Sequence, residues 1–168
     1  MDAFDTIDDY FASHARQLTQ DPSARLEALR KCSFFQPVPD VWLQRISEMA
    51  QIKTFAPDAC ITSQDEGMKA FYVILYGAAE AFRNGKLVGT IETGDCFGEA
   101  IFFADGSITT SATVIADDKI IAAEFSKTAI EALQADPQAM VSMDKALLLA
   151  LFKKLKGANQ KIERLMRV

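Results

Sequence analysis

The sequence contains few of the residues that hydrolytic and metal chemistry require. It has one histidine, His14, and three cysteines, Cys32, Cys60 and Cys96. The cysteines lie far apart, and none has a second cysteine or a histidine at metal-ligand spacing, so we interpret them as reduced core or boundary thiols. A single histidine excludes two-histidine zinc motifs and argues against a Ser-His-Asp or Cys-His centre. We therefore expect no enzymatic activity, no catalytic residues and no metal site.

Long hydrophobic runs are also absent. The best candidate, residues 70–79, contains a glycine and ends at Glu80, whereas a membrane span needs about 18 or more apolar residues. Aspartates occupy the N-terminus, where a secretory signal carries Lys or Arg. We therefore expect a cytoplasmic protein that makes no contact with a membrane.

The composition is that of one ordinary globular domain. The 168 residues are 49% hydrophobic and 24% charged, with a formal net charge of −5. A chain of this length buries enough apolar surface to fold without a disulfide or a metal ion. The acidic balance argues against broad nucleic-acid binding, because phosphate contacts come from clustered Lys and Arg.

Helical spacing marks the first third of the chain. Apolar residues recur at steps of three and four between residues 4 and 18, which places them on one face of a helix. Asp21-Pro22 ends this pattern, and Ser23 is the predicted cap of a second, short helix. Two prolines then separate it from a third helix over 41–49. The predicted face of the first helix consists of Phe4, Ile7, Phe11, His14 and Leu18.

Short apolar or alternating runs follow and predict strands. Asn84-Gly85 lies between two of these runs and is a strong hairpin signal. Several strands at this spacing, with turns between them, favour an antiparallel sandwich or roll. The predicted strands are residues 52–55, 60–62, 71–76, 79–82, 87–91, 112–116 and 120–125.

The chain ends in two predicted helices. Ser126 is the expected cap of a short one, and Asp136-Pro137 ends it and begins a long helix that runs to about Val168. We expect the first half of the long helix to pack on the sheet and the second half to meet a partner helix, because a helix this long projects beyond the domain. Gly157 could mark a bend or a frayed end. The predicted apolar face is Met140, Met143, Leu147, Leu151, Leu155, Ala158, Ile162 and Leu165.

Basic residues are concentrated on this long helix. One interpretation is a solvated face that complements the negative end of the helix dipole, and the other is a surface for an acidic partner. The residues are Lys145, Lys153, Lys154, Lys156, Lys161, Arg164 and Arg167.

Residues 92–100, Glu-Thr-Gly-Asp-Cys-Phe-Gly-Glu-Ala, followed by Ser-Ala-Thr-Val-Ile-Ala at 111–116, strongly resemble the phosphate-binding cassette of the cyclic nucleotide-binding domain family, of the cAMP receptor protein and protein kinase A regulatory subunit type. The resemblance covers about residues 28–155. It implies a mainly β fold, a double-stranded β-helix or jelly-roll-like β-roll with N-terminal helices and a long C-terminal helix. The expected division is an N-terminal helical extension at 1–22, the β-roll with its short helices at 23–136 and the long helix at 137–168.

The resemblance also implies a ligand site. In the family, a glutamate that matches Glu99 holds the ribose 2′-hydroxyl, and amides that match Gly98 and Ala100 meet the cyclic phosphate. An arginine that pairs with the phosphate charge is replaced here by Thr110. Ser111 matches a hydroxyl contact made in part of the family. Another interpretation of Glu99 is a carboxylate that stabilises the start of a short helix.

The missing arginine predicts weak or absent binding of cAMP and cGMP, the ligands that the resemblance implies. No Lys or Arg lies between Lys86 and Lys119, so the segment holds no replacement. Loss of one partner of a buried charge pair costs about 2–5 kcal/mol, which is roughly one and a half to four decades of affinity.

Two functions remain open. The chain is either a regulatory module that senses a cyclic nucleotide or another small ligand and moves its terminal helix in response, or a degenerate domain that binds no nucleotide and serves dimerisation or protein docking. In either case the terminal helix would meet a second copy or a partner protein. The family's transcription factors carry a DNA-binding domain after this helix, and we expect none in this chain, which stops at Val168. An enzyme that uses the same cavity is the weakest alternative, because His14 has no evident acid-base partner.

Overall fold

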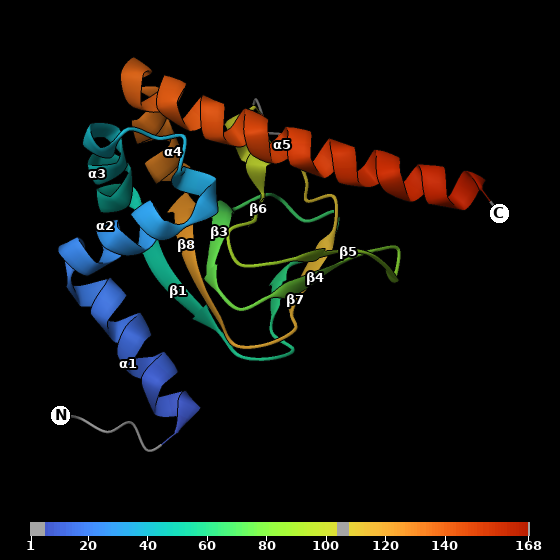
Figure 1. Cartoon of the computed structure of the whole chain (residues 1–168), viewed down its shortest axis with the longest axis horizontal. Helices are drawn as coiled ribbons and strands as arrows, with labels where there is room; N and C mark the ends of the chain where they lie inside the picture. Colours follow the sequence, from blue (N-terminus) through green and yellow to red (C-terminus); the bar gives the residue numbers. More distant parts are fainter. Residues whose placement is uncertain (1–5, 104–107, 168) are drawn as a thin grey trace.

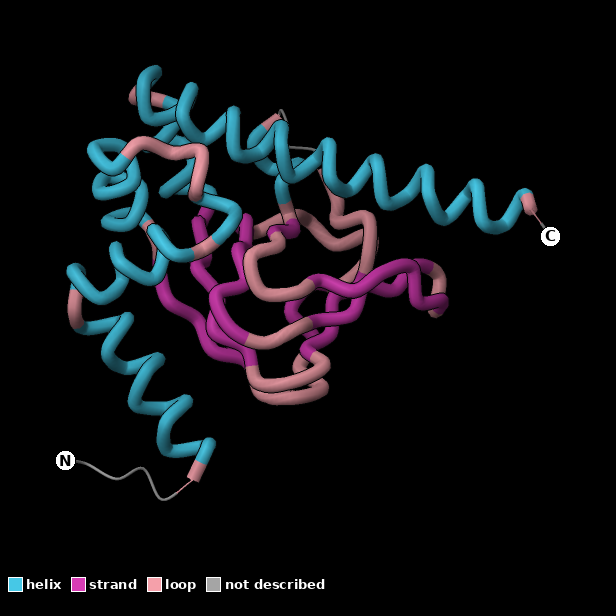
Figure 2. The backbone as a smooth tube through the Cα atoms, in the orientation of Figure 1, coloured by secondary structure: helices cyan, strands magenta, loops and turns pink. Residues whose placement is uncertain are grey.

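The computed structural model describes residues 6–103 and 108–167. Two antiparallel sheets lie at the centre, and helices from both ends of the chain pack beside them (Figures 1 and 2). The helices are α1 (Ile7–Gln20), α2 (Pro22–Lys31), η1 (Ser33–Phe35), α3 (Asp40–Met49), η2 (Glu99–Phe102), α4 (Lys127–Gln134) and α5 (Pro137–Met166). The strands are β1 (Gln51–Phe55), β2 (Cys60–Thr62), β3 (Ala70–Tyr76), β4 (Ala79–Arg83), β5 (Lys86–Ile91), β6 (Cys96–Phe97), β7 (Thr113–Ala116) and β8 (Ile120–Ser126).

The two sheets confirm the predicted β-roll with helices at both ends. One has the strand order β1-β8-β3-β6 and the other β2-β7-β4-β5, and every pairing is antiparallel. Successive side chains of β8 point to opposite faces, as its period of two requires. Ile120 and Ala122 join the apolar cluster that also contains β4 and β7 residues, whereas Ala123 and Phe125 join the cluster packed under the helices. β8 therefore separates two cores.

The predicted strands are present, and one further strand was missed. Asn84-Gly85 forms the tip of the β4–β5 hairpin, with φ of 51° and 72°. Two successive positive φ values are what the tight hairpin turn requires. The missed strand, β6, has only two residues, Cys96 and Phe97, which pair with Val73 and Tyr72 of β3. A run of two residues shows no periodicity, so the sequence pattern could not reveal it.

Side-chain caps fix where the helices begin. Ser126 accepts the Ala129 N–H at 3.2 Å, and Asp136 accepts the Ala139 N–H at the same distance, which confirms both predicted caps. The prediction for α2 is wrong: its cap is Asp21, whose carboxylate accepts the N–H groups of Ser23 and Ala24 at 2.9 and 3.3 Å. Pro22 is suited to the first helical position, which moves the cap one residue before it.

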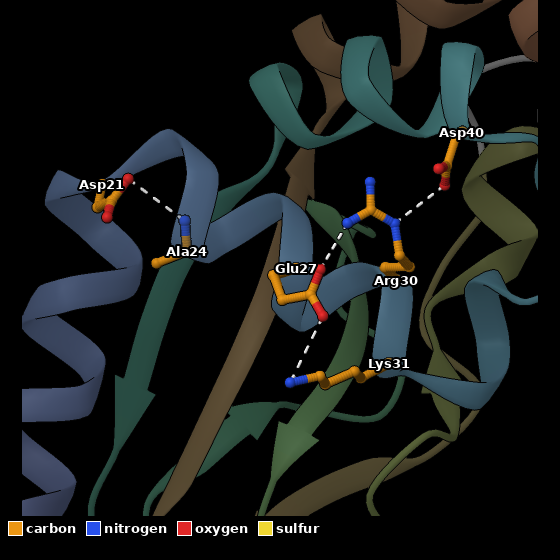
Figure 3. A network of polar contacts seen from close by, with 6 residues as sticks. All are labelled: Asp21, Ala24, Glu27, Arg30, Lys31 and Asp40. Carbon is orange, nitrogen blue, oxygen red and sulfur yellow. Dashed lines mark hydrogen bonds and ion pairs between the residues drawn. The ribbon is translucent and has the colours of Figure 1, made fainter.

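A polar network joins α2 to α3 (Figure 3). The Arg30 guanidinium donates to Glu27 at 2.5 Å and to Asp40 at 3.1 Å, and Lys31 lies 3.4 Å from the other Glu27 oxygen. The hydrogen bond from Arg30 holds the pKa of the Glu27 carboxyl below its ordinary value. Because these side chains are largely exposed, the network orients the two helices and adds little stability.

Only the second half of the predicted α1 face is buried. Leu18 is enclosed, together with Ala15, in a small cluster with Ile121 of β8, whereas Ile7 is 78% exposed. Phe4 lies outside the described residues. The helix is therefore anchored through its last turns.

The first half of α5 is the most deeply packed helical segment. Met143 and Leu147 are fully buried among residues of α3, α4 and η1, in the same cluster as Phe71 and Phe125 of the sheet. The prediction of packing on the sheet is therefore correct in part, since helices supply much of the contact. The helix continues unbroken through Gly157 to Met166, and its last turns extend beyond the sheets (Figure 1). Within the described residues, no helix is both long and apolar enough to cross a membrane.

The burial of α5 predicts different effects for two neighbouring leucines. Leu147→Ala should lower the free energy of unfolding by about 2–5 kcal/mol, because it leaves a cavity in the core. Leu148→Ala, at a side chain that is 65% exposed, should change it by less than about 0.5 kcal/mol. Urea unfolding of dilute protein, followed by circular dichroism, measures both. Equal losses of unfolding free energy in the two variants would show that the face of α5 that carries Leu147 is not the packed one.

Candidate functional site

A cavity of about 1150 Å³ lies beneath α5. Its volume slightly exceeds the range of about 300 to 1,000 Å³ for sites that enclose small organic ligands, so it has room for a ligand of that size. Strands β2, β4, β5 and β7 and the loops around residues 63–69 and 94–100 contribute its other walls. Aromatic lining comes from Phe34, Tyr72, Phe97 and Phe103.

The loop that carries Glu99 is held in one conformation. Gly98 has a φ of +80°, and a Cβ there would lie 2.5 Å from the carbonyl oxygen of Ala70, so only glycine fits. η2 begins at the next residue and buries Ile101 and Phe102 in the helical core. Gln134 of α4 donates to the Phe102 carbonyl oxygen at 3.2 Å. These contacts fix the position of the Glu99 backbone.

The Glu99 side chain is paired with a lysine of α5. Its carboxylate accepts a hydrogen bond from Lys154 Nζ at 2.6 Å, and its side chain is only 18% exposed. Asp95, on the same loop, accepts a similar bond from Lys153 at 2.7 Å. This bond raises the pKa of the Lys153 ammonium. Further along α5, Lys161 donates to the Val88 carbonyl oxygen of β5 at 2.9 Å. Three lysines thus connect α5 to the rim of the cavity.

Thr110, which the resemblance matches to an arginine of the family, has a structural role in this fold. It is buried, and its hydroxyl donates to the carbonyl oxygens of Ser63 and Glu66, the second at 3.1 Å. Its N–H donates to Glu66 and its carbonyl oxygen accepts the Asp65 N–H, both at 2.8 Å. Thr110 therefore joins the 63–66 loop to the segment before β7.

The five predicted site residues, Gly98, Glu99, Ala100, Thr110 and Ser111, all line this one cavity. The sequence analysis missed Lys153, Lys154 and Lys161 as part of the site. Residues 87–118 contain no Lys or Arg, but the fold brings lysines to the cavity from 55 and 58 positions further along the chain. The cations that pair with the carboxylates of the cavity loop thus come from α5 and not from the segment between Lys86 and Lys119.

A weak signal for these lysines was present in the sequence. Ala146, Ala150, Lys154 and Ala158 recur at steps of four, and Lys161 follows three residues later, so all lie along one side of α5. The three alanines have small side chains that leave room beneath the helix, and all five residues line the cavity. The prediction for α5 considered the apolar stripe alone, so it did not identify this second face.

Two polar side chains that line the cavity, those of Tyr72 and Cys96, are buried. Burial raises the pKa of the Cys96 thiol to about 12, so the group stays protonated at neutral pH. Burial also raises the pKa of the Tyr72 hydroxyl. Within residues 6–103 and 108–167, no group of three or more His, Cys, Asp or Glu side chains is placed to hold a metal ion.

The three thiols should differ in reactivity. Cys60 is exposed, whereas Cys32 and Cys96 are buried and burial raises the pKa of both. Iodoacetamide at pH 7–9 should alkylate Cys60 first, because this range lies below the Cys96 pKa and that thiol stays protonated. Mass spectrometry of timed samples measures the order, and urea-unfolded protein is the control in which all three react. Equal rates at Cys60 and Cys96 in folded protein would contradict the described burial.

Comparison with known proteins gives one family and many related folds. The family model described as cyclic nucleotide-binding domain matches residues 52–136. A search of curated protein sequences finds no match.

Three solved structures illustrate the similarity of fold. A cyclic nucleotide-binding domain from Methylobacillus flagellatus has a TM-score of 0.72 at 16% identity and covers 83% of both chains. A putative cyclic nucleotide-binding protein from Geobacter metallireducens has a TM-score of 0.67 at 17% identity and covers 77% of this chain and 96% of its own. The regulatory subunit of a cAMP-independent protein kinase A from Trypanosoma brucei has a TM-score of 0.65 at 14% identity, covering 84% of this chain and 51% of its own.

Proposed function

Because this chain belongs to the cyclic nucleotide-binding domain family, whose domains are regulatory rather than catalytic, we propose that it is a non-catalytic module that senses a small ligand in the cavity beneath α5. We further propose that cAMP and cGMP bind it weakly. Thr110 carries this second proposal, because its buried hydroxyl is committed to the 63–66 loop and provides no positive charge. Weak binding of cAMP is compatible with this fold, since one structure of similar fold is the regulatory subunit of a kinase described as cAMP-independent.

The terminal helix is the element through which occupancy would be reported. Its inner face lines the cavity, and its first half is buried among α3, α4 and η1. A ligand that displaces Lys153 from Asp95, or Lys154 from Glu99, breaks an ion pair that holds the second half of α5 against the loop. A ligand shifts such an equilibrium only by its difference in affinity for the two arrangements.

Restoring the arginine should raise the affinity for cyclic nucleotides. In Thr110→Arg we expect cAMP to bind at least about tenfold more tightly than in the wild type, because a phosphate and a guanidinium form a charge-assisted pair. Isothermal titration calorimetry measures both proteins. Thr109→Arg is the matched control, since this neighbouring side chain is exposed. Low-micromolar cAMP binding by the wild type would contradict the proposal.

The arginine variant loses the Thr110 hydroxyl bond to the 63–66 loop, which is worth on the order of 1 kcal/mol. Circular dichroism therefore has to establish that Thr110→Arg is folded before its affinity is compared. A folded variant without any gain would show that the cavity does not have the shape of a cyclic nucleotide site.

A second observation favours self-association through α5. Val141, Leu148, Leu155 and Ile162 recur at every seventh residue, and each is more than half exposed. A seven-residue repeat keeps an apolar seam facing a helix with the same repeat, and a second copy of this chain supplies one. We propose a symmetric dimer in which these stripes meet, on the side of α5 that faces away from the cavity.

The dimer is tested by light scattering at several protein concentrations. We expect the wild type to show the mass of two chains, and Leu155→Glu to show one, because a charge in the seam is desolvated without a partner. Lys156→Glu is the control at the adjacent exposed position. A wild-type monomer at every concentration would remove self-association and leave a different protein as the partner.

A further inference from the structure

The charge around the cavity is opposite in sign to that of the whole chain. The chain carries a net charge of −5. The cavity is lined by four lysines, at positions 69, 153, 154 and 161, and by three carboxylates, at positions 66, 95 and 99, so cations are in excess there. An acidic protein that concentrates lysines around one cavity favours anions at that place.

Of the two lysines that pair with loop carboxylates, Lys154 has the more protected charge. Its partner Glu99 is 18% exposed and Lys154 itself 42%, whereas Lys153 is 75% exposed and largely screened by solvent. Lys161 already donates to a backbone carbonyl oxygen. Lys154 is also on the face of α5 where Ala150 and Ala158 leave room beneath it.

We propose that Lys154, from outside the cassette, provides the counter-charge for an anionic ligand of this cavity; this inference rests on the proposed ligand-sensing function. The ligand is a small organic anion that also carries a hydroxyl group, such as a sugar phosphate ester. Its anionic oxygens replace Glu99 as the partner of Lys154, and its hydroxyl donates to the carboxylate that Lys154 has left. Every charged group involved keeps a partner in both states.

An uncharged ligand cannot give every charged group a partner in this way. If only a hydroxyl approached Glu99, the Lys154–Glu99 pair would be broken or distorted with no anion to replace the carboxylate. The cavity therefore favours a phosphorylated compound over the corresponding uncharged one. A lysine is a flexible point charge and binds a phosphate less specifically than a bidentate arginine, which agrees with weak binding of cyclic nucleotides.

The test compares cAMP with adenosine, which has the same base and a ribose but no phosphate. Titrations followed by amide chemical shifts measure affinities up to about 10 mM ligand. We expect the wild type to bind cAMP more tightly than adenosine. Lys154→Met should weaken cAMP binding by about threefold to tenfold and leave adenosine binding little changed, while Lys154→Arg should restore the preference.

Lys156→Met is the matched control. It removes the same charge from an exposed neighbouring position that does not line the cavity, so it should leave the preference for cAMP intact. If Lys154 had a purely structural role, Lys154→Met would change the affinities for cAMP and for adenosine by the same factor. Equal or tighter cAMP binding by Lys154→Met, or tighter binding of adenosine than of cAMP by the wild type, would overturn the inference.

Failure of this inference can be distinguished from failure of the proposed function. If the wild type binds no cAMP up to 10 mM but Thr110→Arg does, Lys154 provides no effective counter-charge and the ligand-sensing cavity remains. If neither protein binds cAMP or adenosine, both proposals fall.

Discussion

Lys153 and Lys154 reach from the terminal helix to Asp95 and Glu99, the two carboxylates of the loop that forms part of the cavity wall. Each carboxylate is largely screened from water by its surroundings, and a charge in such a place needs a partner. α5 supplies that partner. In the proposed ligand-sensing function, a ligand would have to satisfy the same carboxylates and lysines, which would couple the chemistry of the cavity to the position of the helix.

The three faces of α5 explain how one helix could combine packing with the proposed ligand contact and self-association. Met143 and Leu147 fix its first half in the core, the small residues and lysines of a second face border the cavity, and the stripe beginning at Val141 is exposed. Because 3.6 residues make one turn, these sets occupy separate sides of one cylinder. A change on the cavity side can thus reach the exposed stripe through a rigid element.

Thr110 illustrates how a position can keep its place in a fold while its chemistry changes. Its side chain and backbone all bond to the 63–66 loop, so the segment before β7 stays in place without the charged contact that an arginine would make. Hydrogen bonds of this neutral kind stabilise the loop. They supply no positive charge, so a counter-charge for the proposed anionic ligand has to come from another element.

Local patterns in the sequence determined most of the fold. The period-two runs, the Asn84-Gly85 turn and the caps at Ser126 and Asp136 act over a few residues, and the structure confirms them. The string at 92–100 was sufficient to identify Gly98, Glu99 and Ala100 as candidate site residues through the resemblance that it carries, whereas the contacts that hold this loop, with Ala70 and Gln134, come from distant parts of the chain.

Tertiary structure decided the electrostatics. Pairs such as Lys154 with Glu99 are separated by 55 positions, and no spacing rule along the chain reports a distance of that kind. The two-residue strand β6 and the division of α5 into buried, cavity and exposed faces likewise depend on which elements pack together. Sequence alone therefore determined the elements and the residue types of the cavity loop, whereas the folded chain determined how that loop is held and which charges face it, because charge acts through space and periodicity acts along the backbone.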